Sequence, residues 1–324
     1  MLARNAEGLY WLGRHLERTE SGCRLLGEQM TALVDRPVQE INFGWRRIYG
    51  TLGRRPPGPV IAVLENDDDY ALADSYTLAD DVTFEPSNPD AIRNSFAQGR
   101  ENARQMRHCI SAEMWMCLNR TWLRFRERRI EDIWQTAPES FYASLAQELG
   151  TFTGVTETTL YRDDGWRFLW LGRLIERAQF TVALLVAQMA AVRPDEGHVD
   201  GEWSSLLRVC QASDAYKRCH GVGVRPERAL ALLVGDAQLP RSLGRTLDEF
   251  ADKLGALATG PGSTDEARRS AGNLAADIQR QWRDTADMAD WDGPLRRMDD
   301  ECRRLHDLMM EAHVAYDPDG APVR

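Results

Sequence analysis

The sequence predicts an all-α protein, built as an internally duplicated antiparallel helical bundle. Apolar residues recur at alternating spacings of three and four along several long segments, which is the pattern of a helix packed on other helices. The phrase W-L-G-R-x-x-E-R occurs twice, at residues 11–18 and 170–177. Strand patterns are nearly absent, and "VIAVL" (60–64) is the one short candidate. Together these features favour helices packed on helices.

The two copies of the phrase lie in two matching predicted helices. The apolar or small stripe of the first is Leu9, Leu12, Leu16, Thr19, Cys23, Leu26, Met30 and Leu33. The stripe of the second, in the same register, is Phe168, Leu171, Ile175, Ala178, Val182, Leu185 and Met189. Aligned without gaps, residues 8–30 and 167–189 share ten identities, where chance would give about one or two at ordinary residue usage. We interpret this as a duplication.

The repeat continues weakly downstream. The pair Trp45 and Ile48 matches Trp203 and Leu206, and "NPDAIRNSF" (88–96) resembles "LPRSLGRTL" (239–247). We therefore expect two related halves, 1–150 and 151–316, followed by a flexible tail at 317–324. Because each copy presents an apolar stripe that it cannot bury alone, the halves are expected to share one core.

Further helices are predicted from the same signals. Residues 90–128 form one long helical stretch without proline, and Pro138 opens a helix that continues to about residue 149. The segment "SLLRVCQASDAYKRC" (205–219) continues the helical pattern in the second half. Glycine and proline at 260–262 indicate a loop. The last helix has its stripe at Leu295, Met298, Cys302, Leu305, Met309 and Ala312.

Composition narrows the function classes. The chain has 324 residues, 43% hydrophobic and 28% charged, with a net charge of −10. An acidic chain without a basic block is a poor nucleic-acid binder. Its six cysteines are far apart and form no CxxC pair, which is typical of reduced thiols. No secretory signal and no window of about 18 apolar residues is present. We expect a cytoplasmic protein that binds neither nucleic acid nor membrane.

The repeated phrase places charged residues beside the apolar stripe. Arg14 and Arg18 are four apart on a helix and Glu17 lies three after Arg14, so they share one face. If the two copies meet, four arginines and two glutamates come together. One interpretation is a salt-bridge network that fixes how the halves pack. The other is a pocket for a carboxylate or phosphate. Gly13 and Gly172 suit close helix packing or ligand access.

Several long motifs carry a family resemblance that covers nearly the whole chain. "MLARNAEGLYWLGRHLERTESGCRLL" (1–26), "NPDAIRNSFAQGRENARQMRHCISAEMWMCLN" (88–119) and "LYRDDGWRFLWLGRLIERA" (160–178) occur in order, followed by "WSSLLRVCQASDAYKR" (203–218). They resemble the alpha-E family, bacterial all-helical proteins named for a shared Glu-Arg motif. The resemblance implies a circularly permuted ATP-grasp protein as partner, often with a transglutaminase-like protein. Because ATP-grasp enzymes join a carboxylate to an amine through an acyl-phosphate, it also implies a peptide- or amide-forming system.

The resemblance points to candidate site residues. The candidate acids or bases are Glu17, Glu176 and Glu113. The candidate substrate-binding residues are Arg14, Arg18, Arg173, Arg177, Arg162, Glu101 and Arg104. Glu113 stands close to two tryptophans in the sequence, an apolar setting suited to a proton-carrying carboxylate. The alternatives are structural, since Glu101 and Arg104 can brace a helix surface as an i,i+3 pair and Arg162 precedes a helix start.

Other chemical signatures are missing from the sequence. It contains neither a GxxxxGK[ST] loop nor a GxGxxG after a strand, so we expect no nucleotide or other cofactor. HExxH and GxSxG are also absent, and no metal site is predicted. His306 and His313 are seven apart and are interpreted as ordinary surface residues. The leading hypothesis is a component of an ATP-grasp-dependent system. The alternatives are a stand-alone acyl-transfer, amide-forming or amide-hydrolysing enzyme and a structural scaffold.

Overall fold

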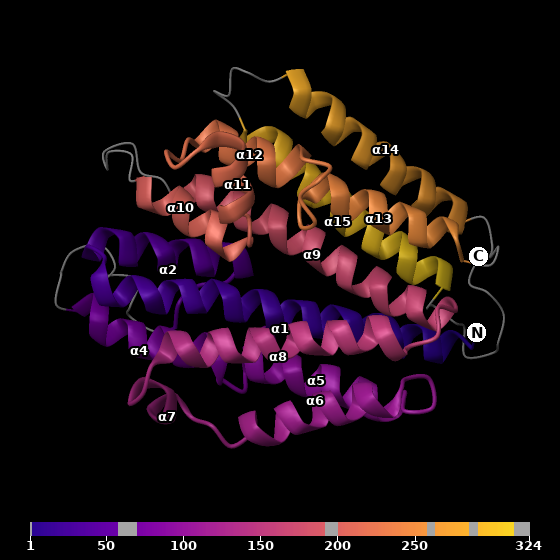
Figure 1. Cartoon of the computed structure of the whole chain (residues 1–324), viewed down its shortest axis with the longest axis horizontal. Coiled ribbons are helices and arrows are strands. Elements are labelled where there is room, and N and C mark those ends of the chain that lie inside the picture. The colour runs from indigo at the N-terminus through magenta and orange to yellow at the C-terminus, as the bar shows by residue number, and fades with distance from the viewer. Residues whose placement is uncertain (1, 58–69, 192–199, 258–262, 285–290, 314–324) are drawn as a thin grey trace.

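The protein is all-helical over the part that the computed structural model describes, residues 2–57, 70–191, 200–257, 263–284 and 291–313 (Figure 1). No strand occurs in these ranges, and the candidate strand at 60–64 lies outside them. The helices are α1 (Ala3–Asp35), α2 (Val38–Leu52), α4 (Tyr70–Thr83), α5 (Ile92–Gln105), α6 (Ala112–Phe125), α7 (Ile130–Trp134), α8 (Pro138–Thr159), α9 (Asp164–Ala191), α10 (Asp200–Val209), α11 (Ser213–His220), α12 (Pro226–Gly235), α13 (Leu243–Gly255), α14 (Ser263–Asp284) and α15 (Asp292–His313). The all-α prediction is confirmed.

The two motif helices, α1 and α9, form the centre of the molecule. Helix α1 packs on α5 and α8, and α9 packs on α2, α13 and α15. Figure 1 shows the α4–α8 group on one side of this centre and the α10–α15 group on the other. The two motif helices run in the same general direction, while α8 runs against both (Figure 1). The central pair is therefore parallel, with antiparallel neighbours around it.

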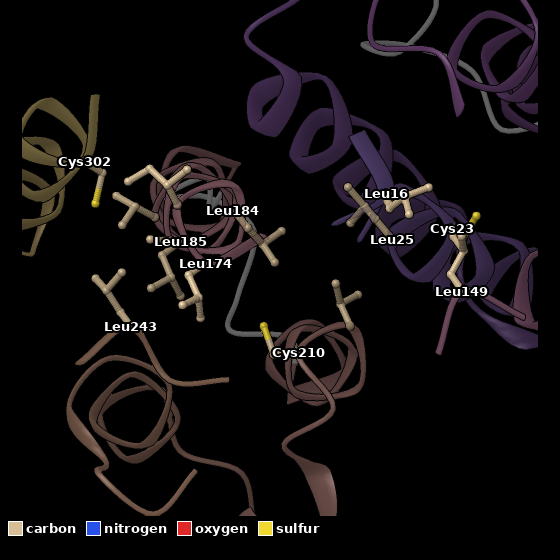
Figure 2. Packing of buried hydrophobic residues seen from close by; sticks show 14 of the residues in the cluster. Leu16, Cys23, Leu25, Leu149, Leu174, Leu184, Leu185, Cys210, Leu243 and Cys302 are labelled. Atoms are coloured by element: carbon tan, nitrogen blue, oxygen red, sulfur yellow. The ribbon is translucent and has the colours of Figure 1, made fainter. Parts of the chain in front are cut away.

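One hydrophobic cluster runs through the whole described chain, from Ala6 to Met309. The predicted stripe of α1 is buried from Leu9 through Met30. The side chains of α9 pack against several neighbouring helices, because α1, α2, α13 and α15 surround that helix. In Figure 2 Leu174 and Leu185 project from α9 in the region of Leu243 and Cys302.

Helix α9 also has the length and composition of a membrane span, alone among the helices of the described ranges. Within its most apolar window, 67% of the residues are buried inside the protein. The apolar character of α9 is thus accounted for by its central position in the bundle.

Three predicted boundaries need correction. The long helix expected over 90–128 is two helices, because Ser111 accepts a 3.1 Å hydrogen bond from the Met114 N–H and starts α6. The segment at 205–219 is likewise interrupted, since Gln211 has a left-handed φ of 55°. Helix α8 continues to Thr159, ten residues beyond the end expected near residue 149.

Candidate functional site

Helices α1 and α9 touch backbone to backbone where their motif glycines meet. A Cβ atom added to Gly13 would lie 2.1 Å from the carbonyl oxygen of Leu169, and one added to Gly172 would lie 1.9 Å from that of Tyr10. No side chain larger than hydrogen fits at either place without moving a helix. The glycines thus set the helix separation, and this separation brings the charged motif residues together.

Glu17 is the buried anchor of one half of the charged cluster. It is 0% exposed and accepts hydrogen bonds from three arginines. Arg173 donates from Nε at 2.9 Å and from Nη2 at 2.7 Å, and Arg177 donates from Nε at 2.8 Å and from Nη2 at 3.2 Å. Arg241, in the loop before α13, donates from Nη2 at 2.7 Å. Both carboxylate oxygens are saturated with donors.

Glu176 is the anchor of the other half and is 6% exposed. Arg14 donates to it from Nε at 2.7 Å, and Arg18 donates from Nε at 2.6 Å and from Nη2 at 3.2 Å. The Nη1 atom of Arg18 pairs with Asp90 at 3.0 Å. Every nitrogen of the Arg18 side chain therefore has a carboxylate partner.

The contacts of the two helices are reciprocal. The Nη2 atom of Arg14 donates to Gln179 at 2.6 Å, and the Nη2 atom of Arg173 donates to Glu20 at 2.9 Å. The two acceptors occupy matching places, three residues after the motif glutamate of their own helix. Each arginine also lies over the tryptophan of its own motif, at 5.0 Å for Arg14 and 5.2 Å for Arg173.

The Glu17 half and the Glu176 half of the charged cluster differ in net charge. Four guanidiniums (Arg173, Arg177, Arg241 and Arg24) make direct ion pairs with two carboxylates (Glu17 and Glu20), a surplus of two positive charges among the direct partners. Glu249 also acts electrostatically on Arg177, without a direct ion pair among the described contacts. The Glu176 half has two guanidiniums (Arg14 and Arg18) against two carboxylates (Glu176 and Asp90) and is balanced. A buried charge surplus is unfavourable without a counter-ion. The Glu17 half is therefore the part of the cluster equipped to attract an anion.

The pKa shifts agree with fixed ion pairs. Burial alone would raise the pKa of Glu17, but Arg177, Arg241 and Arg173 outweigh it and hold this pKa well below its usual range. The pKa of Glu176 is likewise lowered, because its arginines outweigh burial. Burial lowers the pKa of Arg241 to about 10, with Arg177 nearby adding to the effect of burial. Both glutamates thus remain ionised near neutral pH and carry no proton to donate.

His306 of α15 joins the cluster, which the sequence interpretation as an ordinary surface residue missed. Its Nδ1 atom lies 2.7 Å from the Tyr10 hydroxyl, and the Nη1 atom of Arg14 lies 3.0 Å from each of its ring nitrogens. Burial and then Arg14 lower the pKa of His306 to about 4, so the imidazole is neutral. Its expected companion, His313, has a side chain outside the described residues. His306 links α15 to the crossing.

The remaining candidate residues lie on exposed surfaces. Glu101 and Arg104 pair with each other at 2.6 Å, with side chains 43% and 55% exposed. Arg162 is 65% exposed and pairs with Glu157 at 2.9 Å. Glu113 is exposed in the first turn of α6, so the expected apolar setting is wrong. None of these four makes an ion pair with the motif cluster among the described contacts.

Three charged residues of the Glu17 half were not predicted from the sequence. Glu20 and Arg24 lie three and seven residues after Glu17 on the same helix, a spacing that places them on its face. Arg241 belongs to "LPRSL" (239–243), which signals a helix start but not a contact with α1. The helical spacing could have indicated the first two, whereas the third depends on tertiary packing alone.

An open cleft of about 790 Å³ adjoins the Glu17 half. Its walls are α1 from Cys23 to Thr31, α8 from Glu139 to Thr151, and Arg208 with Gln211 at the end of α10. Arg24 lines it and is linked to the cluster through Glu20. Over the described part of the chain, no group of three or more His, Cys, Asp or Glu residues is arranged to hold a metal ion.

Comparison with known proteins gives a family match over almost the full length. The model of the family Alpha-E, described as a predicted alpha-helical domain with a conserved ER motif, matches residues 1–314. Uncharacterized protein Mb2597 of Mycobacterium bovis is 28% identical over 287 residues, which cover 80% of this chain. Uncharacterized protein Rv2567 of Mycobacterium tuberculosis aligns to the same extent. The chain spans 30% of the length of these relatives. No solved structure matches the chain.

Proposed function

Because the chain belongs to the Alpha-E family, we propose that it is a component of an ATP-grasp-dependent peptide- or amide-forming system. In this proposal a circularly permuted ATP-grasp protein, assisted in some systems by a transglutaminase-like protein, is the partner. The present chain binds no nucleotide and holds a carboxylate or phosphorylated intermediate beside Arg177 and Arg241. The proposed setting is the cytoplasm, where ATP is available.

The charge surplus of the Glu17 half carries the proposal. Arg177 and Arg241 both donate hydrogen bonds to the Glu17 carboxylate. Among the described contacts, Arg241 donates to it from one nitrogen, Nη2. The Arg241 side chain is 18% exposed, and no hydrogen bond of its Nε or Nη1 atom occurs among the described contacts. Guanidinium donors suit carboxylate and phosphate oxygens, which they bind in a planar, two-pronged geometry. An anion here would offset the uncompensated buried charge.

The chemistry of such a system gives three candidate anions. The ligase transfers the γ-phosphoryl group of ATP to a substrate carboxylate, which gives an acyl-phosphate and ADP. An amine nitrogen then attacks the acyl carbon, the amide bond forms, and inorganic phosphate leaves with the electrons of the broken C–O bond. The starting carboxylate, the acyl-phosphate and the departing phosphate are all anions that the arginines can bind.

A structural role for the Glu176 half is supported by different observations. Arg18 is fully paired, the charges balance, and the backbones meet at Gly13 and Gly172. Because the arginines around Glu17 and Glu176 hold both carboxylates in the ionised form, neither suits the acid/base role that a stand-alone enzyme needs. We also infer that the reciprocal contacts descend from an internal duplication, after which the Glu17 half acquired Arg24 and Arg241.

The experiment is ATP-dependent coupling by the neighbouring ATP-grasp protein, with and without this chain, followed by mass spectrometry over amino acids and short peptides. Co-elution of the two proteins is measured in parallel. Arg241→Gln is the test variant and Glu101→Gln, on the far surface, is the control. We expect a condensed product that requires the chain, is lost with Arg241→Gln, and persists with Glu101→Gln.

Two outcomes contradict the proposal. If the ATP-grasp protein neither co-elutes with the chain nor changes its coupling rate when the chain is added, the partnership is wrong. If coupling needs the chain but proceeds equally well with folded Arg241→Gln, the partnership stands and the anion site at the Glu17 half is wrong.

A further inference from the structure

One edge of the molecule carries a charge opposite to that of the whole chain. Residues 93–129 contain nine arginines and three glutamates, with no lysine or aspartate, which gives a net charge of +6 in a chain of −10. These arginines are spread along the sequence, and the fold gathers them because α5 and α6 pack on each other at the lower edge of Figure 1. We call the exposed side of residues 107–129, together with Arg100, the arginine face.

We propose that the arginine face docks a partner protein, which contacts it through an acidic surface with an apolar centre. That this partner is the ATP-grasp protein rests on the proposed function. The docking surface itself rests on unpaired charge, on arginines held in place by neutral groups, and on exposed apolar side chains among them.

Most arginines of this edge have no acidic partner in the protein. Of the nine, three make ion pairs among the described contacts, namely Arg104, Arg124 and Arg126. Four others are exposed and make none there, namely Arg107, Arg120, Arg128 and Arg129. An ordinary soluble surface mixes charges of both signs, whereas a field of one sign attracts partners of the opposite sign. The arginine face is therefore suited to an anionic partner.

Two arginines of the face are held in place without being neutralised. The guanidinium carbons of Arg100 and Arg107 lie 5.3 Å and 5.1 Å from the centre of the Trp115 ring. Arg100 also donates to the side-chain oxygen of Asn119, from Nε at 3.0 Å and from Nη2 at 2.8 Å. Neither an indole ring nor an amide carries a net charge, so these contacts restrict the side chains and leave their charge available. Restricted donors lose less entropy when a partner binds.

Apolar side chains lie among the arginines on the outer side of α6. Met116 is 59% exposed and Leu123 is 49% exposed. The two are seven residues apart, which is about 10 Å along one side of a helix, and Arg120 lies between them on that side. Protein interfaces are enriched in methionine, aromatic residues and arginine and depleted in lysine. The arginine face has this composition.

A protein fits the arginine face better than a lipid surface does. The apolar side of α6, which includes Met114, Leu118 and Phe125, is buried inside the protein, whereas a membrane-bound helix turns its apolar side to the lipid. Guanidinium groups also match the carboxylates of aspartate and glutamate in a two-pronged geometry. In the mycobacterial relatives the matching region makes up 30% of the chain, so there it is joined to much further protein.

Arg120 and Met116 provide the test variants. Arg120→Glu reverses an exposed, unpaired charge in the middle of the arginine face, and Met116→Ala removes exposed apolar area beside it. Arg269→Glu is the matched control, since Arg269 is also exposed and makes no ion pair among the described contacts. It belongs to α14, at the opposite edge of the molecule in Figure 1. Both reversals change the net charge of the chain by the same amount.

Binding of the full chain to the ATP-grasp protein is measured by calorimetry at low and at high salt, and thermal unfolding checks that each variant is folded. We expect Arg120→Glu to weaken binding by about tenfold or more, because it replaces attraction with repulsion. Met116→Ala should weaken it by about threefold or more, through lost apolar contact, and Arg269→Glu should bind like the wild type. Binding of the wild type should weaken as salt screens the exposed charges.

The outcomes separate this inference from the proposed function. If Arg120→Glu and Arg269→Glu bind the ATP-grasp protein equally well, docking through the arginine face is wrong, and the proposed function stands if coupling still requires the chain. If the complex forms and Arg120→Glu weakens it, but no coupled product appears, the docking stands and the proposed amide-forming function is wrong.

Two competing probes test other anionic partners of the same face, namely vesicles of phosphatidylcholine with phosphatidylserine and single-stranded oligothymidylate. If the wild type fails to bind the ATP-grasp protein, docking of this partner is overturned. If it then binds either probe and Arg120→Glu abolishes that binding, the arginine face is a membrane or nucleic-acid surface instead of a protein-docking surface.

Discussion

The glycine crossing makes a quantitative prediction. In Gly13→Ala the new Cβ would lie 2.1 Å from the carbonyl oxygen of Leu169, which is a backbone atom that cannot rotate away. Helix α9 must move by about 1 Å or more to restore an ordinary van der Waals distance. The destabilisation follows from what that movement does to the ion pairs around the crossing.

The ion pairs Arg14–Glu176 and Arg173–Glu17 are both 2.7 Å long and are buried. Lengthening each by about 1 Å takes it beyond hydrogen-bond range, and a hydrogen bond to a charged group contributes about 1.5–3 kcal/mol. The expected loss is therefore about 3–6 kcal/mol. The gain in helix propensity on replacing glycine offsets about 1 kcal/mol of it.

The assay is thermal and urea unfolding of Gly13→Ala beside Gly150→Ala. The control gains about 1 kcal/mol, because its added methyl group meets open space in the same type of helix interior. For a chain of this length, a net loss of about 3 kcal/mol lowers Tm by about 4 °C. If Gly13→Ala were as stable as the control, the close contact of α1 and α9 would be refuted, along with the ion-pair geometry that depends on it.

Three further predictions concern charge. Arg18→Gln should lower the free energy of unfolding by about 3 kcal/mol, because it removes two hydrogen-bond donors to buried Glu176. Arg241→Gln should leave the free energy of unfolding unchanged or raise it, because it relieves a positive surplus. Equal losses for the two variants in urea titrations would contradict the charge count. Folding lowers the pKa of His306 to about 4 from an unfolded value near 6.5. The contribution of neutral His306 to the free energy of unfolding is therefore present above about pH 6.5 and is lost as the pH falls toward 4. A His306→Gln variant should show a smaller fall in Tm between these pH values, and an unaltered slope would remove His306 as the cause. Glu101→Gln should change stability by less than about 0.5 kcal/mol in the same titration, since its pair with Arg104 is exposed, and a larger loss would mean that this pair is not a simple surface pair.

The sequence was sufficient for the all-α fold class and for the buried stripe of α1, although several helix boundaries were not predicted. Periodicity places Leu9, Leu12 and Leu16 on one stripe, and those residues are buried. The repetition of W-L-G-R-x-x-E-R indicated that four arginines and two glutamates come together if the two copies meet, and in the structure Glu17 lies 2.7 Å from Arg173. Local patterns succeed here because a helix fixes which side chains share a face, whatever the helix later packs against.

The sequence was insufficient where a contact joins distant segments without a repeated pattern. Arg241 reaches Glu17 across 224 positions, and His306 reaches Arg14 across 292. Nothing local distinguishes Arg241 from other arginines at helix starts. Conversely, Glu113 lies near tryptophans in the sequence but is exposed, because successive helix residues point in different directions and neighbours in the chain need not share a face.

The difference between the two halves connects the fold to its proposed use. A helix crossing maintained only for stability has no reason to carry unbalanced charge, and the Glu176 half is balanced around Arg14 and Arg18. The Glu17 half holds the two equivalent arginines of the other motif copy, Arg173 and Arg177, and adds Arg24 and Arg241. Of these two additions, Arg24 also lines the open cleft. Since extra buried cations destabilise a protein that binds no anion, their presence supports the proposed binding of an anion at the Glu17 half.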